Sequence, residues 1–112
     1  MSNFADGEFA WTSFDKPARC FDYKYFGNIN SERIRLHPTQ KPVALYEWIL
    51  KNYANVGDKI LDTHLGSGSS RIAAYKLGFD FWACEIDKTY FDAANKRFDT
   101  EIAAFGIDNG YF

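Results

Sequence analysis

Residues 59–87, KILDTHLGSGSSRIAAYKLGFDFWACEID, contain two short apolar runs separated by a glycine-rich turn and a helix-compatible segment. The first run ends at Asp62, the turn carries Gly66 and Gly68, and the second run ends at Glu85. The order strand, turn, helix, strand requires a crossover connection, which makes the two strands parallel neighbours. We therefore predict an α/β fold whose centre is a βαβ unit.

The turn and Glu85 together predict a binding site above the ends of the strands. Gly66 and Gly68 allow a tight turn and a close approach of the backbone to a ligand, and the following helix offers free N–H groups at its start. An acid about 20 residues beyond such glycines accepts hydrogen bonds from ribose hydroxyls in nucleotide-binding sheets. Ser70 and Arg71 stand where a dinucleotide motif has its third glycine, and the Gly-Lys-Ser/Thr of a P-loop is absent. A terminal ribose without pyrophosphate is favoured, and a plain α/β unit whose glycines only serve the turn is the alternative.

Alternating aromatic residues predict a β-hairpin over residues 8–26. Phe9 and Trp11 alternate with polar or small residues, and Phe21, Tyr23 and Tyr25 do the same. Pro17 suits the turn between the two runs. One face of this ladder is expected to pack on a core, and a platform for base stacking is the alternative.

The segment that follows the hairpin is polar and leads to a predicted helix. Arg33 and Arg35 lie on one side of an extended chain, where they either contact phosphates or are simply solvated. The block HPTQKP at 37–42 then serves either as a rigid helix entry or as a means of holding polar side chains at a helix N-terminus. Helical spacing of apolar residues follows it from Val43, and Gly57-Asp58 ends the connection to the first strand.

A second amphipathic helix is predicted after the βαβ unit, over residues 88–105. Its apolar positions are expected to pack on the sheet, and Gly106 is expected to end it.

Composition limits the chain to one small domain in a reduced setting. It has 112 residues, a formal charge of −2 and 19% aromatic residues, so some rings of so small a domain can remain exposed for a partner. Cys20 and Cys84 do not form a disulfide framework, and Cys84 is expected in a buried strand, which favours the cytoplasm. Cys and His are too scattered for a zinc site, and no apolar run approaches the roughly 20 residues of a membrane span.

Three stretches together resemble the cofactor-binding half of bacterial and phage DNA amino-methyltransferases. They are HPTQKP at 37–42, LDTHLGSGSS at 61–70 and CEID at 84–87, in the order of the permuted β class, and AWTSFDKPARCF at 10–21 is similar to the segment upstream in phage-type members. The resemblance implies a partial Rossmann-like methyltransferase fold, with S-adenosyl-L-methionine as methyl donor and adenine N6 or cytosine N4 of DNA as acceptor. It also implies a restriction-modification setting.

The resemblance assigns a cofactor-binding role to particular residues. Asp62, Leu65, Gly66, Ser67 and Gly68 would surround the methionine end of the cofactor, with Ser69 at the helix start. Glu85 would bind the ribose and Ile86 would pack on the adenine, while Thr39 and Lys41 would lie near the amino-acid end. The family's Asp-Pro-aromatic stretch before the glycines is replaced here by Thr63-His64-Leu65 after Asp62, and we expect His64 to be a surface or supporting residue rather than a base.

A second departure concerns catalysis. The family carries an Asp/Asn/Ser-Pro-Pro-aromatic motif that accepts the target amino group and stacks on the flipped base. The three prolines of this chain, Pro17, Pro38 and Pro42, are not adjacent, so the motif is absent. We expect no catalytic residue in this chain and no methyl transfer by the chain alone.

The missing motif leaves several hypotheses open. The chain is expected to be the cofactor-binding portion of a methyltransferase, which meets DNA only through the complete enzyme. Alternatives are a non-catalytic cofactor-binding or assembly module, a degenerate relic, or, less favoured, a nicotinamide-dinucleotide enzyme. In the family, the strands bearing the motif lie between the hairpin and the cofactor strands, so a second copy or a complementing N-terminal half is expected to fill that place.

Overall fold

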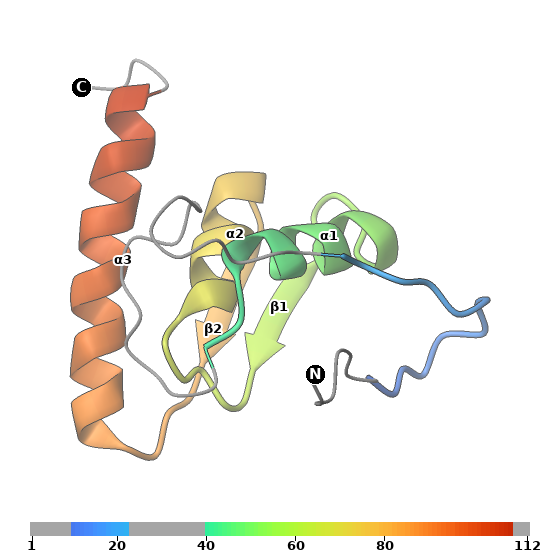
Figure 1. Ribbon diagram of the computed structural model, residues 1–112, viewed down its shortest axis with the longest axis horizontal. Coiled ribbons are helices and arrows are strands. Elements are labelled where there is room, and N and C mark those ends of the chain that lie inside the picture. The colour runs from blue at the N-terminus through green and yellow to red at the C-terminus, as the bar shows by residue number, and fades with distance from the viewer. Residues whose placement is uncertain (1–9, 23–39, 109–112) are drawn as a thin grey trace, which may run out of the picture.

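The computed structural model describes residues 10–22 and 40–108 (Figure 1). The elements are α1 (Val43–Tyr53), β1 (Lys59–Asp62), α2 (Ser69–Leu77), β2 (Asp80–Ala83) and α3 (Lys88–Asp108). The two strands pair in parallel, with Ile60 opposite Phe81 and Leu61 opposite Trp82. The predicted βαβ unit is therefore confirmed, together with a helix on either side of it in the sequence.

Helix α2 is the centre of the core. Ile72, Ala73 and Ala74 of this helix are fully buried, because α1 and α3 flank it and the sheet lies against it. Val43 and Leu50 pack onto it from α1, and Phe98 and Ile102 reach the same cluster from α3. The small residues of α2 allow the flanking helices to approach closely, and burial of the larger apolar side chains contributes about 1.5–3 kcal/mol each.

Within residues 10–22 and 40–108, the helices cover one face of the sheet and leave the other open. Ile60 and Phe81 are partly buried against the core, whereas Leu61 and Trp82 are 66% and 54% exposed. These two residues are cross-strand partners and side chains alternate between the faces of a sheet, so they form an apolar pair on the uncovered face.

The predicted hairpin is wrong over the part of it that the structure describes. Residues 10–22 contain neither helix nor strand, and the remainder of 8–26 lies outside the described residues. This segment contacts α1 instead: the Phe14 and Phe21 rings lie 5.5 Å from those of Tyr53 and Trp48, respectively. Trp11 is 88% exposed. Alternation alone does not make a strand, because a strand needs a neighbour for its backbone hydrogen bonds.

Two further expectations need correction. Helix α3 continues through Gly106 to Asp108, because a glycine costs only about 1 kcal/mol within a helix. Cys84 is exposed and lies just after β2 rather than within a buried strand. Both cysteines are unpaired.

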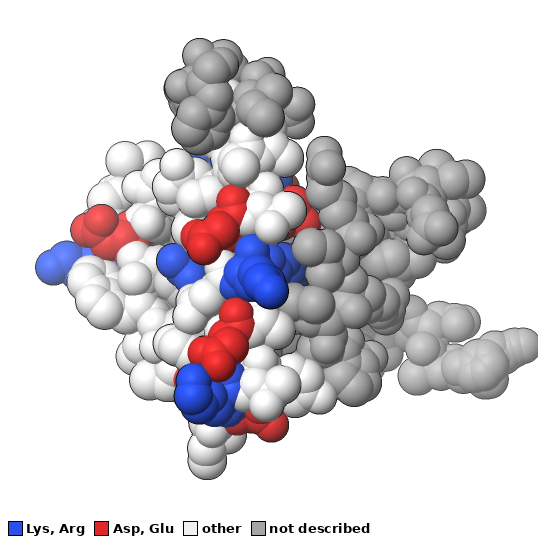
Figure 2. Space-filling view, turned by 90° about the vertical axis from the view of Figure 1, so that its left-hand side faces the viewer, with Lys and Arg blue, Asp and Glu red and all other residues white. Residues whose placement is uncertain are grey.

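The outer side of α3 is polar. Positive and negative side chains are interspersed on the face that this helix presents (Figure 2). One pair is Lys88 and Asp92, whose Nζ and Oδ2 atoms are 2.9 Å apart one turn along the helix. Such a mixture of charges is typical of a solvated helix face.

Candidate functional site: a pocket between the glycine loop and the start of α1

Backbone hydrogen bonds bring Glu85 close to residues 65–69, which we call the glycine loop. The ladder between the strands continues beyond their ends, where Cys84 N–H donates to Asp62 O at 3.0 Å and Leu65 N–H donates to Cys84 O at 2.9 Å. Gly66 and Gly68 then take the left-handed conformation, with φ of 58° and 86°. This conformation is strained for residues other than glycine, so the glycines at positions 66 and 68 are what allow the backbone to make this turn.

The Glu85 carboxylate faces the loop. Its Oε1 accepts a hydrogen bond from Gly66 N–H at 2.8 Å, and its Oε2 accepts one from Asp87 N–H at 2.9 Å. A carboxylate has about four lone-pair sites on its two oxygens, so such a group can accept hydrogen bonds from several donors at once. The backbone thus fixes the direction of the carboxylate before any ligand binds.

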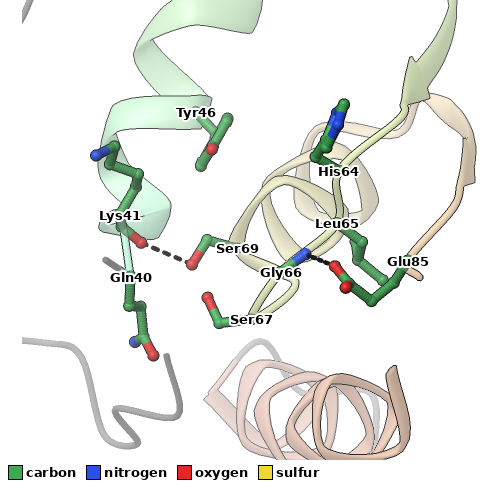
Figure 3. Close-up of a pocket in the computed structure, with 9 residues that line it drawn as sticks. All are labelled: Gln40, Lys41, Tyr46, His64, Leu65, Gly66, Ser67, Ser69 and Glu85. Atoms are coloured by element: carbon green, nitrogen blue, oxygen red, sulfur yellow. Dashed lines mark hydrogen bonds between the residues drawn. The ribbon is translucent and has the colours of Figure 1, made fainter. Parts of the chain in front are cut away.

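A cavity of about 350 Å³ lies between this carboxylate and the start of α1. The lining residues come from the segment that leads into α1, from α1 itself, from the glycine loop and from the tip of β2 (Figure 3). They are Gln40, Lys41, Tyr46, His64, Leu65, Gly66, Ser67, Ser69 and Glu85. The volume lies within the range of small-molecule sites, and the lining presents both polar and apolar surface to a ligand.

The cavity brings together six of the ten cofactor-binding residues expected from the sequence: Lys41, Leu65, Gly66, Ser67, Ser69 and Glu85. Gly68, the residue before α2, allows the loop to turn but does not line the cavity. Asp62 stabilises the loop, since the Asp62 carboxylate accepts hydrogen bonds from His64 N–H and Ser70 Oγ. Ile86 is fully exposed and does not line the cavity. Thr39 lies outside the described residues, as do Arg33 and Arg35.

Three lining residues were not assigned to the site from the sequence. Gln40 is buried, and its place within HPTQKP between two prolines was a signal that could have identified it. Tyr46 belongs to the apolar face of α1, and it contacts both the core and the cavity. His64 lines the cavity while its Nδ1 lies 2.9 Å from Thr63 Oγ1. Helical periodicity predicts which side of α1 is buried, but it does not predict which residue on that side also lines a cavity.

The described residues contain no sign of two other kinds of site. Over residues 10–22 and 40–108, no group of three or more His, Cys, Asp or Glu side chains is placed to hold a metal ion. In the same ranges, no helix is both long and apolar enough to traverse a bilayer.

A parallel βαβ unit with a glycine loop and a carboxylate at the tip of its second strand defines a nucleotide-cofactor-binding α/β protein. The comparison with known proteins narrows this class. Residues 11–96 match the family model described as DNA methylase, which groups N6 and N4 methyltransferases, and the chain belongs to this family. The resemblance to DNA amino-methyltransferases found in the sequence is thereby confirmed.

Several bacterial methyltransferases are similar to this chain. The type II methyltransferase M.HpaI of Haemophilus parainfluenzae is 34% identical over 80% of this chain and 28% of its own length. M2.DpnII of Streptococcus pneumoniae is 42% identical over 58% of this chain and 24% of its own length. The chain thus spans about a quarter of the length of these curated relatives.

A solved structure agrees with this assignment. The crystal structure of the M1.HpyAVI–SAM complex superposes with a TM-score of 0.56 and 35% identity, over 71% of this chain and 41% of that chain. The partial Rossmann-like methyltransferase fold expected from the sequence is confirmed.

Proposed function

We propose that this chain is the S-adenosyl-L-methionine-binding portion of a DNA amino-methyltransferase that methylates adenine N6 or cytosine N4. The observation that carries the proposal is the Glu85 carboxylate, fixed by Gly66 N–H at 2.8 Å on the wall of a cavity of about 350 Å³. A carboxylate in this position is suited to the two hydroxyls of a ribose. The M1.HpyAVI structure, to which the chain is similar, was solved as a complex with SAM.

The residues of the cavity fit such a ligand in their chemistry. Glu85 would hold the ribose, and the backbone of residues 65–69 would hold the amino-acid end, with Lys41 on the far wall. The bound cofactor would supply the methyl group. The chain itself binds and orients this donor, and Ile86 is available as an exposed apolar surface beside the ribose site.

We propose further that the chain does not transfer methyl groups by itself. The acceptor motif needs two adjacent prolines, and Pro17, Pro38 and Pro42 stand apart. A complementing polypeptide that carries the motif, or a second copy of the chain, would complete the enzyme and bring it to DNA, with Arg33 and Arg35 as proposed phosphate contacts. The exposed pair Leu61 and Trp82 supports a covering partner on the open face of the sheet. A reduced cytoplasmic setting, in a bacterial or phage restriction-modification system, belongs to the same proposal.

Calorimetric titration with S-adenosylhomocysteine tests the binding step. We expect saturation at one site per chain, and Glu85→Gln should weaken binding by about tenfold or more because it replaces a charged acceptor. Asp80→Asn is the matched control, since Asp80 lies exposed at the opposite end of the same strand and should leave the affinity unchanged. Absence of any binding by the folded chain would contradict the proposal and favour the alternative, a degenerate relic that keeps the fold only.

The partner requires a separate experiment. Analytical ultracentrifugation of the chain alone should show association that Trp82→Thr reduces, if a second copy covers the open face of the sheet. Methyl transfer to DNA should be undetectable for the chain alone. Activity should return on co-expression with a polypeptide that supplies the Pro-Pro-aromatic motif, and full activity of the isolated chain would contradict this part of the proposal.

A further inference from the structure

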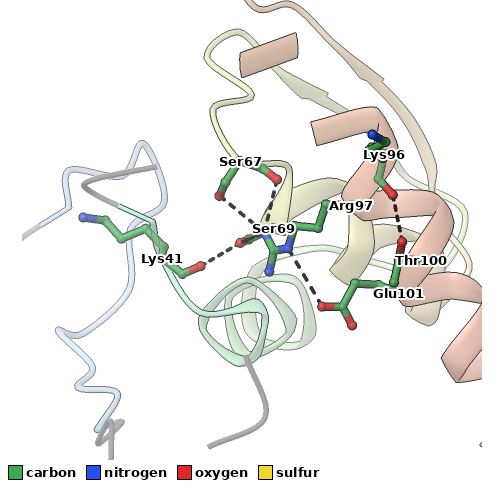
Figure 4. A network of polar contacts seen from close by, with 7 residues as sticks. All are labelled: Lys41, Ser67, Ser69, Lys96, Arg97, Thr100 and Glu101. Atoms are coloured by element: carbon green, nitrogen blue, oxygen red, sulfur yellow. Dashed lines mark hydrogen bonds and ion pairs between the residues drawn. The ribbon is translucent and has the colours of Figure 1, made fainter. Parts of the chain in front are cut away.

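Arg97 of α3 is buried directly behind the glycine loop. The residue is only 1% exposed, which is unusual for an arginine, because a charged group leaves water only when partners receive it. Its Nη1 donates to Ser67 O at 3.1 Å, to Ser67 Oγ at 3.3 Å and to Ser69 Oγ at 2.9 Å (Figure 4). Its Nε lies 3.9 Å from Glu101 Oε2, one turn further along α3. The guanidinium therefore fastens the loop to the third helix.

The contact extends from the loop to the opposite wall of the cavity. Ser69 Oγ, which accepts from Arg97, donates in turn to Lys41 O at 2.7 Å. Ser67, Ser69 and Lys41 all line the cavity, whereas Arg97 does not. A single buried side chain is thus hydrogen-bonded, directly or through one hydroxyl, to two walls of the site without reaching its interior (Figure 4).

Such an arrangement matters for a loop of this composition. Residues 66–69 are Gly-Ser-Gly-Ser, so the loop has no large side chain of its own to pack and hold its conformation. A flexible loop loses conformational entropy when a ligand orders it, and a loop held in place beforehand avoids that loss. Hydrogen bonds from a charged donor in a buried setting are among the stronger ones that can do this.

We propose that Arg97 is a positioning residue for the cofactor site: it holds the glycine loop and, through Ser69, the Lys41 segment at the spacing that the cofactor needs. This inference rests on the proposed function, because it assigns the fixed shape of the cavity to cofactor binding. The alternative is that Arg97 only fills the core between α2 and α3.

The test uses Arg97→Met together with Glu101→Gln, so that no buried carboxylate loses its counter-ion. Hydrogen exchange of the backbone amides of Ser67, Gly68 and Ser69, measured without ligand, should become faster relative to the amides in the centre of α2. The affinity for S-adenosylhomocysteine should fall by about tenfold, which corresponds to the loss of about one charge-assisted hydrogen bond. Ile102→Val is the matched control, since Ile102 packs on the core from the same helix without a hydrogen bond to the loop. It should leave both readouts unchanged.

A double-mutant cycle shows whether Arg97 acts through Ser69. Ser69→Ala should weaken binding in the wild-type background and should add little in the Arg97→Met/Glu101→Gln background. Unchanged loop exchange in the folded variant, or full additivity with Ser69→Ala, would overturn the proposal. If the wild-type chain bound no S-adenosylhomocysteine, the proposed function would fail, whereas the exchange measurement would still decide whether Arg97 positions the loop.

Discussion

Substituting Gly68 by alanine should destabilise the protein for two separable reasons. Gly68 precedes α2 with φ of +86°, and an added Cβ would lie 3.3 Å from the Cβ of Ala94, which is buried in α3. The left-handed conformation costs an L-residue about 1–2 kcal/mol. The close contact adds about 1–2 kcal/mol, the lower part of the range for overpacking, because the backbone of α3 must move slightly. The free energy of unfolding should therefore fall by about 2–4 kcal/mol in total.

Gly78→Ala is the matched control for the backbone term. Gly78 ends the same helix with φ of +81°, and an added Cβ there meets no atom within 4 Å. Its cost should be the backbone term alone, about 1–2 kcal/mol. Urea unfolding followed by circular dichroism measures both losses, provided that the slope with denaturant is the same for all variants.

Comparing the stability losses of Gly68→Ala and Gly78→Ala tests whether the glycine loop packs on α3. Equal losses for Gly68→Ala and Gly78→Ala would mean that Gly68 and Ala94 are not in close contact. A second check is Ala94→Gly in the Gly68→Ala background, which removes the opposing Cβ. Although a glycine within a helix costs about 1 kcal/mol, the two changes should be coupled favourably by about 1 kcal/mol rather than add.

Three further substitutions test the fold at other places. Ile72→Val, at a fully buried position, should lower the free energy of unfolding by about 0.5–1.5 kcal/mol, and thermal unfolding would show no change if α2 were not central to the core. Lys88→Ala removes an exposed ion pair with Asp92 and should change stability by less than about 0.5 kcal/mol, so a loss above 1 kcal/mol would disagree with its exposure. Trp82→Thr, beside Leu61 on the open face of the sheet, should reduce binding of an apolar dye and should cost clearly less than the roughly 3–5 kcal/mol of a truncated core tryptophan, because 54% of Trp82 is exposed; a core-like loss of stability would contradict an uncovered face.

The βαβ unit was predictable because its signals are local. The signals are apolar runs, glycines and helical spacing, and each lies within a short stretch of chain. Each favours one backbone conformation, and the tertiary structure does not override that preference here. The same reasoning placed Glu85 at a strand tip, since the carboxyl ends of neighbouring parallel strands meet at one edge of a sheet.

The errors arose where a local pattern needed a distant partner. The alternating aromatics of residues 10–22 suit a strand, but in the described part of the chain no strand lies beside them, and Phe14 and Phe21 contact α1 instead. Gly106 was expected to end α3, although a glycine preference of about 1 kcal/mol is easily outweighed in a long helix. Cys84 was expected in a buried strand because it lies in an apolar run. Such a run does not show which face of a sheet is covered, and Cys84 is exposed.

By itself, the sequence determined the order of the elements, the position of the glycine turn and the acid that follows it, because these depend on spacing along the chain. The tertiary structure alone decided which side chains share the cavity and what holds its walls. Arg97 is 30 residues from Ser67 in the sequence and occupies an ordinary position in an amphipathic helix, yet the packing of α3 buries it against the loop. Contacts between residues so far apart depend on how whole helices and strands pack, and no local pattern encodes that geometry.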